Sequence, residues 1–544
     1  MLRPVIPSHD ADAAALWVDS RVRTESLLQQ AALALLSGVL VGIPWLSPEL
    51  YATAWFGWVP LLFALRHASL RVAFFCGWLT GTVCFAIASY WMLDFVAHLD
   101  TFSVPLTTLL SISFWVYAGL SLGFGCLVFR WLTVRLEGWE LVGFPLSLVS
   151  LMAVYPLLFQ THFAEAQASF LSGLQGVDLF GAKGLDLLMM LFSVLVYRLL
   201  AGSRRGVAMV ANMAALGVVV AWLAYGAFNL ASWDSRMQDW EVRRIGLVQP
   251  NDQVTLDIPE PPSGFSREEP EEMAATRRLA RAGAQVVIWP EARYKGYFDN
   301  FSVRQAYAKT LKQSGVALIF HDAEQRWQDG ESVNFNSVMH IDQEGQESGF
   351  YRKMQRMPFG EYRPELFSLP GLNGLTTYLF GEFLRPLAAG TRHAEFAVDG
   401  MRVVPKVCYE TAFPSDVAQA IGSDAAGKVL LFISQDNWFG ETTQPFQHRA
   451  MSVVRAVENR VPMIHLINNG PSVVTAPNGR TLASTQAFSR AEVIADLSFS
   501  PTSGGSLYSR YPHAFERLMF VSLALLCLAG LVSGRRRRGA LAVD

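Results

Sequence analysis

Arg402-Val403-Val404-Pro405-Lys406-Val407-Cys408-Tyr409-Glu410 is a β-branched run that ends on a thiol. The run predicts a strand, and Cys408 stands where that strand stops. The four other cysteines lie inside long apolar segments, where a thiol behaves as a small hydrophobe: Cys76, Cys84, Cys126 and Cys527. Cys408 is therefore the candidate nucleophile of the more polar part of the chain. A buried, inert cysteine is the alternative that this run alone leaves open.

The surroundings of Cys408 have the pattern of an α/β domain. From residue 242 to residue 498, short β-branched runs alternate with polar helical stretches. Strands are predicted at 242–249, 284–291, 316–320, 401–408, 428–434, 463–468, 471–476 and 491–496, with a hairpin over 335–351. Helices are predicted at 268–283, 303–313 and 446–460. Such alternation indicates a largely covered sheet, and reactive groups gather beyond the strand ends of such sheets.

Three residues near predicted strand ends suit acyl transfer: Glu291, Lys353 and Cys408. A thiol attacks a carbonyl group only as its thiolate, so it needs a proton acceptor, and Glu291 can take the proton and later return it. The oxyanion of the tetrahedral intermediate needs a fixed positive donor, which Lys353 can supply. A helix predicted to begin near Pro414 would add its amino-terminal amides to the stabilisation of the thiolate.

Other interpretations of these residues remain open. Glu291 by itself could be a surface carboxylate, and Lys353 by itself a solvated lysine. A cysteine–histidine pair would need His321, His448 or His465, none of which stands in a local signature. The ten histidines show no metal-ligand spacing with Cys or Asp, so we expect no metal and no cofactor.

The rest of the chain is a membrane protein by composition. Hydrophobic residues make up 51% of the 544, and the excess is concentrated in 27–235 and 517–534. Apolar segments of about 20 residues are long enough to cross a bilayer. About eight spans are predicted, at 27–46, 52–66, 72–94, 104–129, 140–159, 184–201, 206–231 and 517–534. The fold class is therefore a polytopic α-helical membrane domain (27–235) with an α/β domain (242–498) inserted before the last span.

Arginines indicate the orientation. They occupy alternate connections between the spans, and four more, Arg535 to Arg538, directly follow the last span. The short loops 47–51 and 95–103 contain no Lys or Arg. By the positive-inside rule, both termini (1–26 and the basic tail 535–544) are expected in the cytoplasm, with 242–498 on the opposite, periplasmic side of a bacterial inner membrane. A net charge of −2 gives no reason to expect a nucleic acid partner.

Seven short motifs, in order, resemble the apolipoprotein N-acyltransferase family, the membrane-embedded branch of the nitrilase (carbon–nitrogen hydrolase) superfamily. They are Val248-Gln249, Trp289-Pro290-Glu291, Tyr351-Arg352-Lys353, Pro358-Phe359-Gly360-Glu361-Tyr362, Cys408-Tyr409-Glu410, Ser434-Gln435-Asp436-Asn437-Trp438-Phe439-Gly440 and Asn468-Asn469-Gly470. The resemblance implies that 242–498 folds as a nitrilase-like αββα sandwich. It also implies that Glu291, Lys353 and Cys408 form the superfamily's catalytic triad.

The resemblance implies supporting or substrate-binding roles for Glu361, Tyr409, Glu410 and Trp438. The implied reaction moves an acyl chain from a phospholipid, through a thioester on Cys408, to the α-amine of a diacylglyceryl-cysteine apolipoprotein. The expected partners are thus a phospholipid donor, a lipoprotein acceptor and the bilayer, and we expect a monomer.

The chain departs from the family pattern at three places: the run 250–257, the residues 292–295 after Glu291, and His465, which replaces a common arginine. A different acyl donor or amine acceptor is therefore an alternative. Two further alternatives are a membrane-tethered amidase that uses water, and a transporter or scaffold, which the scarcity of charged residues in the spans disfavours. The glycine-rich apolar segment 370–384 is predicted to meet the lipid or to cover the site.

Overall fold

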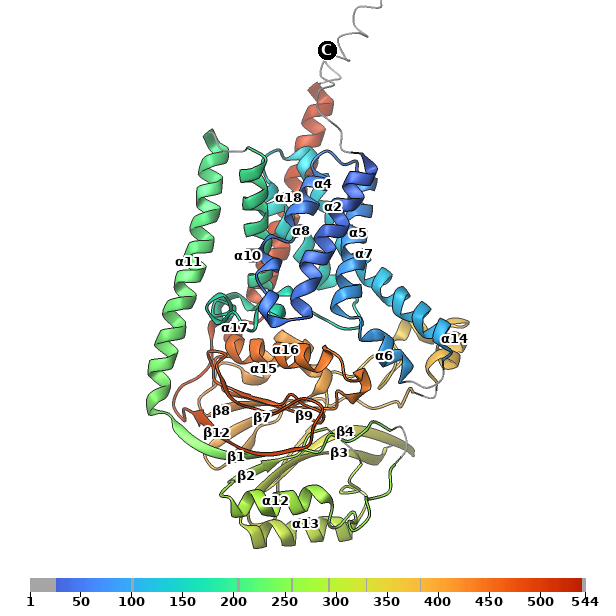
Figure 1. Ribbon diagram of the computed structural model, residues 1–544, viewed down its shortest axis with the longest axis vertical. Coiled ribbons are helices and arrows are strands. Elements are labelled where there is room, and N and C mark those ends of the chain that lie inside the picture. The colour runs from blue at the N-terminus through green and yellow to red at the C-terminus, as the bar shows by residue number, and fades with distance from the viewer. Residues whose placement is uncertain are drawn as a thin grey trace, which may run out of the picture.

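The computed structural model describes residues 26–540 except 99–101, 203–205, 256–257, 292–293, 329 and 382. The predicted amino-terminal segment lies outside the described residues except for Ser26, and so do the last four residues of the predicted basic tail. A bundle of helices stands on one side of an α/β domain, and the carboxy-terminal helix returns along the bundle (Figure 1). The last strand of the α/β domain, β12 (Ala491–Phe499), pairs antiparallel with its first, β1 (Glu241–Gln249).

Among the described residues, six helices are long and apolar enough to cross a membrane. They are α2 (Leu27–Gly42) with the 3₁₀ turn that extends it to Trp45, α5 (Leu70–Ala88), α7 (Val104–Arg135), α10 (Val177–Leu200), α11 (Gly206–Arg236) and α18 (Ala514–Ala540). The predicted spans 52–66 and 140–159 form shorter helices instead, namely α3 (Thr53–Phe56), α4 (Val59–Leu65) and α8 (Glu140–Val154). Gly57 ends α3, and Pro60, which has no amide hydrogen to donate, lies in the first turn of α4. The multi-pass prediction is confirmed, and its count of spans is approximate.

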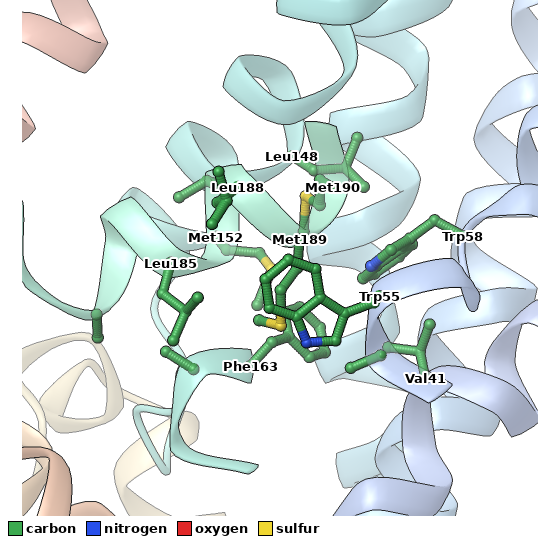
Figure 2. Packing of buried hydrophobic residues seen from close by; sticks show 14 of the residues in the cluster. Val41, Trp55, Trp58, Leu148, Met152, Phe163, Leu185, Leu188, Met189 and Met190 are labelled. Atoms are coloured by element: carbon green, nitrogen blue, oxygen red, sulfur yellow. The ribbon is translucent and has the colours of Figure 1, made fainter. Parts of the chain in front are cut away.

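The short helices are held in the middle of the bundle by large aromatic side chains. Trp55 and Trp58 lie among Phe163, Met189 and Met190 in Figure 2. Trp58 is 1% exposed, and its ring meets that of Phe163 edge to face at 5.2 Å. The indole of Trp55 donates to the side chain of Gln167 at 2.9 Å, which satisfies its polar group. These contacts bury α3 and α4 inside the bundle despite their length.

Two six-stranded sheets form the α/β domain. The first has the order β12-β1-β2-β3-β4-β5, and its remaining members are β2 (Val286–Ile288), β3 (Ala317–Gln328), β4 (Glu331–Ile341) and β5 (Glu347–Arg352). The second has the order β11-β10-β9-β8-β7-β6. Its members are β6 (Phe396–Val398), β7 (Met401–Val407), β8 (Lys428–Ser434), β9 (Met463–Ile467), β10 (Val473–Thr475) and β11 (Thr481–Ser484). Every predicted strand is present, and β3 runs past its predicted end because it pairs with β4 along its whole length.

The sheets pack face to face, and helices cover both outer faces. Apolar residues of β1, β2, β7 and β8 fill the space between the sheets. Helices α12 (Glu271–Arg281) and α13 (Phe301–Ser314) pack on the first sheet. Helices α15 (Pro414–Ile421) and α16 (Gln444–Asn459) lie between the second sheet and the bundle (Figure 1). This is the predicted αββα sandwich, with its second helical layer against the membrane helices.

Buried ion pairs join the sandwich to the bundle. Arg455 of α16 bonds Glu165 at 3.0 Å, and Arg460 bonds Asp178 of α10 at 2.8 Å. Arginines of the span connections lie at the other end of the bundle, where the side chain of Arg130 bonds the carbonyl of Ala68 and that of Arg198 bonds Glu140. The α/β domain thus lies at the end of the bundle opposite to these arginines.

Candidate active site

Cys408 occupies a strained turn at the end of β7. Its φ is +48°, a left-handed value that is uncommon for a residue with a side chain. Hydrogen bonds hold the turn from both sides, since the amide of Val407 donates to Glu410 at 2.8 Å and the hydroxyl of Thr411 donates to the carbonyl of Cys408 at 2.7 Å. A short 3₁₀ helix (Cys408–Ala412) follows, and α15 begins at Pro414 as predicted. The thiol therefore lies at a strand-to-helix turn, directly after the last residue of β7.

Glu291 follows β2 and is held from two sides. The side-chain amide of Asn336, on β4, donates to its Oε1 at 2.8 Å, and the backbone amide of Gln435 donates to its Oε2 at 3.2 Å. The preceding Trp289 is fully buried, which anchors the chain just before the carboxylate. Glu291 is thus an oriented carboxylate inside the domain, not the surface residue of the alternative interpretation.

Lys353 follows β5 and is 3% exposed. Its Nζ lies 2.8 Å from Oε1 of Glu361 and 3.9 Å from Oε1 of Glu291. The other oxygen of Glu361 accepts the backbone amide of Met357 at 2.7 Å. Lys353 is therefore a buried cation between two carboxylates and not a solvated lysine.

Burial and neighbouring charges shift the pKa values of both Lys353 and Cys408. Burial by itself lowers the pKa of Lys353, but Glu361, Glu291 and Cys408 together raise it above its ordinary value, so the ammonium stays charged. Burial raises the pKa of the Cys408 thiol; Glu291 raises it further, and Lys353 opposes the change. The resting group is accordingly a thiol that needs a base at the moment of attack.

The three side chains line one cavity of about 280 Å³ at the junction of the sandwich and the bundle. Aromatic side chains make up much of its wall: Trp91, Phe159, Phe383, Tyr409, Trp438 and Phe439. Tyr409 reaches into the bundle, where its hydroxyl donates to the carbonyl of Leu158 at 2.7 Å. The ring of Trp438 meets that of Phe383 at 5.4 Å. The wall of the cavity is thus built from both parts of the protein.

The structure brings together all seven residues that the sequence singled out, although Glu410 differs from the rest. Glu361, Tyr409 and Trp438 line the cavity beside Glu291, Lys353 and Cys408. Glu410 is fully buried, and its carboxylate accepts the hydroxyl of Tyr351 at 2.7 Å as well as backbone amides. It therefore holds the site together rather than facing the space where a substrate would lie.

Two features of the site were missed by the sequence analysis. Asn336 donates to Glu291 and also, at 3.3 Å, to Glu361, so it bridges the two carboxylates and helps to fix the distance between them. It stands in an ordinary alternating hairpin and carries no motif. The second is an Asp436–His448 pair, in which His448 Nε2 lies 3.2 Å from the carbonyl oxygen of Cys408. Of the pair, only Asp436 stood within a quoted motif.

The cysteine–histidine alternative gains no support from these positions. His448 contacts the carbonyl group of Cys408, and its other nitrogen faces Asp436. His321 lines the cavity, and burial lowers its pKa to about 3. His465 is buried between the hydroxyls of Ser434 and Ser452, at 3.0 Å from each. In the described part of the chain, no three His, Cys, Asp or Glu residues are grouped so that they could hold a metal ion.

The segment 370–384 forms helix α14 (Leu372–Phe380) beside α6 (Met92–Ala97), as Figure 1 shows. Tyr378 and Leu375 are 79% and 52% exposed, as the sequence led us to expect. The phenylalanines are turned inward, since Phe380 packs on Phe102 and Phe383 is 9% exposed in the cavity wall. The segment therefore closes one side of the cavity with one face and presents apolar groups with the other.

Two of the three departures from the family pattern touch the site. Gln253, Val254 and Thr255, from the run 250–257, line the cavity, while 256–257 lie outside the described residues. His465 does not line the cavity, but its ring packs edge to face at 4.6 Å on that of His448, which does. Of the residues that follow Glu291, Arg293 lies outside the described residues, and Lys295 forms a buried pair with Glu272.

Comparison with known proteins agrees with this architecture. The model of the apolipoprotein N-acyltransferase N-terminal domain matches residues 37–195, and that of the carbon–nitrogen hydrolase family matches residues 268–503. A protein from Geobacter metallireducens named apolipoprotein N-acyltransferase is 28% identical over 529 residues, covering 92% of this chain and 93% of its own length. One of the same name from Azotobacter vinelandii is 28% identical over 539 residues, covering 91% and 94%.

Among solved structures, an amidase from Nesterenkonia sp. is 19% identical with a TM-score of 0.35, covering 51% of this chain and 96% of the amidase. The two family models together match the helical bundle and the sandwich, in the order in which the chain builds them. This chain belongs to the apolipoprotein N-acyltransferase family.

Proposed function

We propose that this protein transfers an acyl chain from a membrane phospholipid, through a thioester on Cys408, to the N-terminal amine of a diacylglyceryl-cysteine apolipoprotein. Family membership supports the N-acylation of lipoproteins. The observation that carries the proposed chemistry is the meeting of Cys408, Glu291 and Lys353 in one aromatic-walled cavity beside the membrane helices. One copy of the chain supplies all of these residues, which supports a monomeric enzyme.

In the first half-reaction, Glu291 takes the proton of the Cys408 thiol as Sγ attacks the ester carbonyl of the phospholipid. The negative charge that develops on the carbonyl oxygen is stabilised by the Lys353 ammonium, which Glu361 holds at 2.8 Å. When the tetrahedral intermediate collapses, the C–O bond breaks and the proton on Glu291 passes to the leaving oxygen. A thioester and a lysophospholipid result.

In the second half-reaction, the α-amine of the acceptor attacks the thioester carbonyl, and Glu291 takes a proton from the attacking nitrogen. The C–S bond then breaks, an amide forms, and the proton returns to the sulfur of Cys408. The same base and the same cation therefore serve both half-reactions. The sulfur of Cys408 is the nucleophile in the first and the leaving group in the second.

The surroundings of the cavity support a lipid donor. Its wall includes Trp91 and Phe159 from the bundle, so a substrate that enters it lies beside the membrane helices. The arginines of the span connections lie at the opposite end of the bundle. By the positive-inside rule, this arrangement supports a cavity at the periplasmic face of a bacterial inner membrane, with both termini in the cytoplasm.

Mass spectrometry of the intact protein, purified from membranes, tests the proposal. We expect an acyl adduct on Cys408 that a lipopeptide amine removes, with the acyl group recovered as an amide. Cys408→Ser should lose the adduct and the transfer while retaining its fold, because the change is nearly isosteric. An enzyme that releases free fatty acid at the same rate with and without the amine would instead be the tethered amidase.

A further inference from the structure

His448 of α16 lies directly behind the turn that carries Cys408. Its Nε2 is 3.2 Å from the carbonyl oxygen of Cys408 and 3.0 Å from the hydroxyl oxygen of Thr411. Its Nδ1 is 2.8 Å and 3.0 Å from the two carboxylate oxygens of Asp436. The imidazole thus connects a carboxylate on one side with the backbone of the reactive cysteine on the other.

Both members of the pair are inside the protein. His448 is 5% exposed and Asp436 is fully buried. A buried carboxylate is stable only if it is paired and hydrogen-bonded, and Asp436 finds its partner in this ring. His448 lines the cavity, but its ring nitrogens are engaged by the carbonyl oxygen of Cys408, the hydroxyl of Thr411 and the carboxylate of Asp436, so neither residue has a place in the two half-reactions described above.

The charged and titratable groups around the ring favour its protonated form. Burial lowers the pKa of His448, but Asp436 from the β8–α16 connection, the carbonyl group of Cys408 and Glu291 all act in the opposite direction, and together they raise the pKa. His465 of β9 packs edge to face at 4.6 Å, and burial lowers its own pKa, with His448 and Arg449 adding to the effect. His465 therefore stays neutral, and His448 can donate from both ring nitrogens.

We infer that His448, oriented by Asp436, is a positioning residue for Cys408. Its N–H toward the Cys408 carbonyl holds the left-handed turn, and that turn decides where the sulfur points. The inference rests on the proposed function, in which Cys408 is the nucleophile.

The reason lies in the backbone of the turn. A cysteine at φ +48° is held against its own preference, and it persists only where surrounding groups fix it. Thr411 donates to the same carbonyl oxygen at 2.7 Å, so two donors hold the carbonyl group of Cys408 in place. Rotation of this peptide group would release the turn. A displacement of the sulfur by about 1 Å is enough to slow an attack on the order of 10²-fold.

Three variants test the inference: His448→Gln, His448→Leu and Asp436→Asn. The rate of thioester formation from phospholipid is measured by quenching the reaction at set times and recording the intact mass of the protein. The rate of alkylation of Cys408 by iodoacetamide is followed by peptide mass spectrometry, which separates this thiol from the four others. His340→Gln is the matched control, because His340 is also a buried histidine of the sandwich but lies outside the cavity lining.

We expect His448→Leu to slow thioester formation on the order of 10²-fold with an unchanged KM for the donor. His448→Gln, which keeps an N–H donor, should recover part of that loss. Asp436→Asn should act in the same direction, and the double variant Asp436→Asn/His448→Gln should lose less than the product of the two single losses, because the residues act as one unit. His340→Gln should lower thermal stability without changing either rate per folded molecule.

Equal rates in the wild type and in folded His448→Gln and Asp436→Asn would overturn the inference, as would losses confined to thermal stability. The near-isosteric Asp436→Asn keeps the test decisive if His448→Leu does not fold. Failure of the proposed function would show differently: the wild type itself would form no thioester, whereas the alkylation rates would still report whether His448 positions the thiol.

Discussion

Glu410 and Met354 are joined by a hydrogen bond of 2.9 Å between the buried carboxylate of the one and the backbone amide of the other. The carboxylate also accepts the amide of Val407 at 2.8 Å. Met354 follows Lys353, and Val407 precedes Cys408, so one side chain ties the ends of strands from different sheets together. The distance between the nucleophile and the cation across the sandwich is therefore set by Glu410.

Replacing Glu410 by alanine should loosen this connection. The amides of Val407 and Met354 would lose their acceptor, and each unsatisfied buried donor costs about 1–3 kcal/mol. We expect thermal unfolding in detergent at a lower temperature, and slower thioester formation in the folded fraction. Glu344→Ala, at the exposed turn between β4 and β5, is the control and should change neither. Unaltered thioester kinetics in Glu410→Ala would contradict the role given to this residue.

Glu291→Gln should have opposite effects on two reactions of Cys408. Burial and then Glu291 raise the pKa of the thiol, so removing the carboxylate charge should lower that pKa. The rate of alkylation by iodoacetamide should then increase over a lower pH range than in the wild type. Thioester formation from phospholipid should nevertheless stop, because no group remains to protonate the leaving oxygen. A pH profile of alkylation unchanged by the substitution would show that Glu291 does not act on the thiol.

Lys353→Met should slow thioester formation on the order of 10²-fold or more, as the loss of other oxyanion donors does. The substitution also leaves Glu361 and Glu291 near each other without a cation, so the stability of the fold should decrease. Single-turnover assays separate the two effects when rates are corrected for the folded fraction. If thioester formation were as fast as in the wild type and only the transfer to the amine were slowed, Lys353 would not stabilise the oxyanion of the first half-reaction.

Helix α14 offers a test of orientation and of lipid entry. Gly374 and Tyr378 are exposed on it, so cysteines placed there in the Cys408→Ser background should react with a membrane-impermeant thiol reagent in intact spheroplasts. Labelling that needs disrupted membranes would contradict the proposed topology.

Helix α14 is also expected to take part in the entry of lipid. Leu375→Ser/Tyr378→Ser should weaken the use of long-chain phospholipid more than that of a short-chain soluble thioester. Equal losses with the two donors would show that α14 has no part in lipid entry.

The ion pair of Arg460 with Asp178 should stabilise the joint between the sandwich and the bundle. Arg460 is 1% exposed, and removing one partner of a buried pair costs about 3–5 kcal/mol. Arg460→Gln should therefore lower the temperature of thermal unfolding. Arg480 forms a pair of the same kind with Asp234 of α11 but is 50% exposed, so Arg480→Gln should cost about 0–1 kcal/mol. Similar losses in the two variants would mean that burial of the pair does not matter here.

The sequence by itself determined the class of fold and singled out residues that the fold brings together at one site. Apolar runs indicate membrane helices because a bilayer imposes their length, and β-branched runs with reactive residues at their ends indicate an α/β domain with a site at the strand ends. The sequence does not determine the number of spans, since Gly57, Pro60 and Pro145 interrupt apolar runs and only packing decides how long such helices are.

Only the tertiary structure decided how the site is held. Asn336 reaches Glu291 from a hairpin, Glu410 clamps two sheets, and His448 reaches Cys408 from a helix that follows it in the chain. Each of these residues carries an ordinary polar side chain in an ordinary pattern, and its role depends on a partner that folding brings near. Hydrogen bonds act over about 3 Å, so a pattern along the chain cannot reveal them until the strands and helices are placed in space.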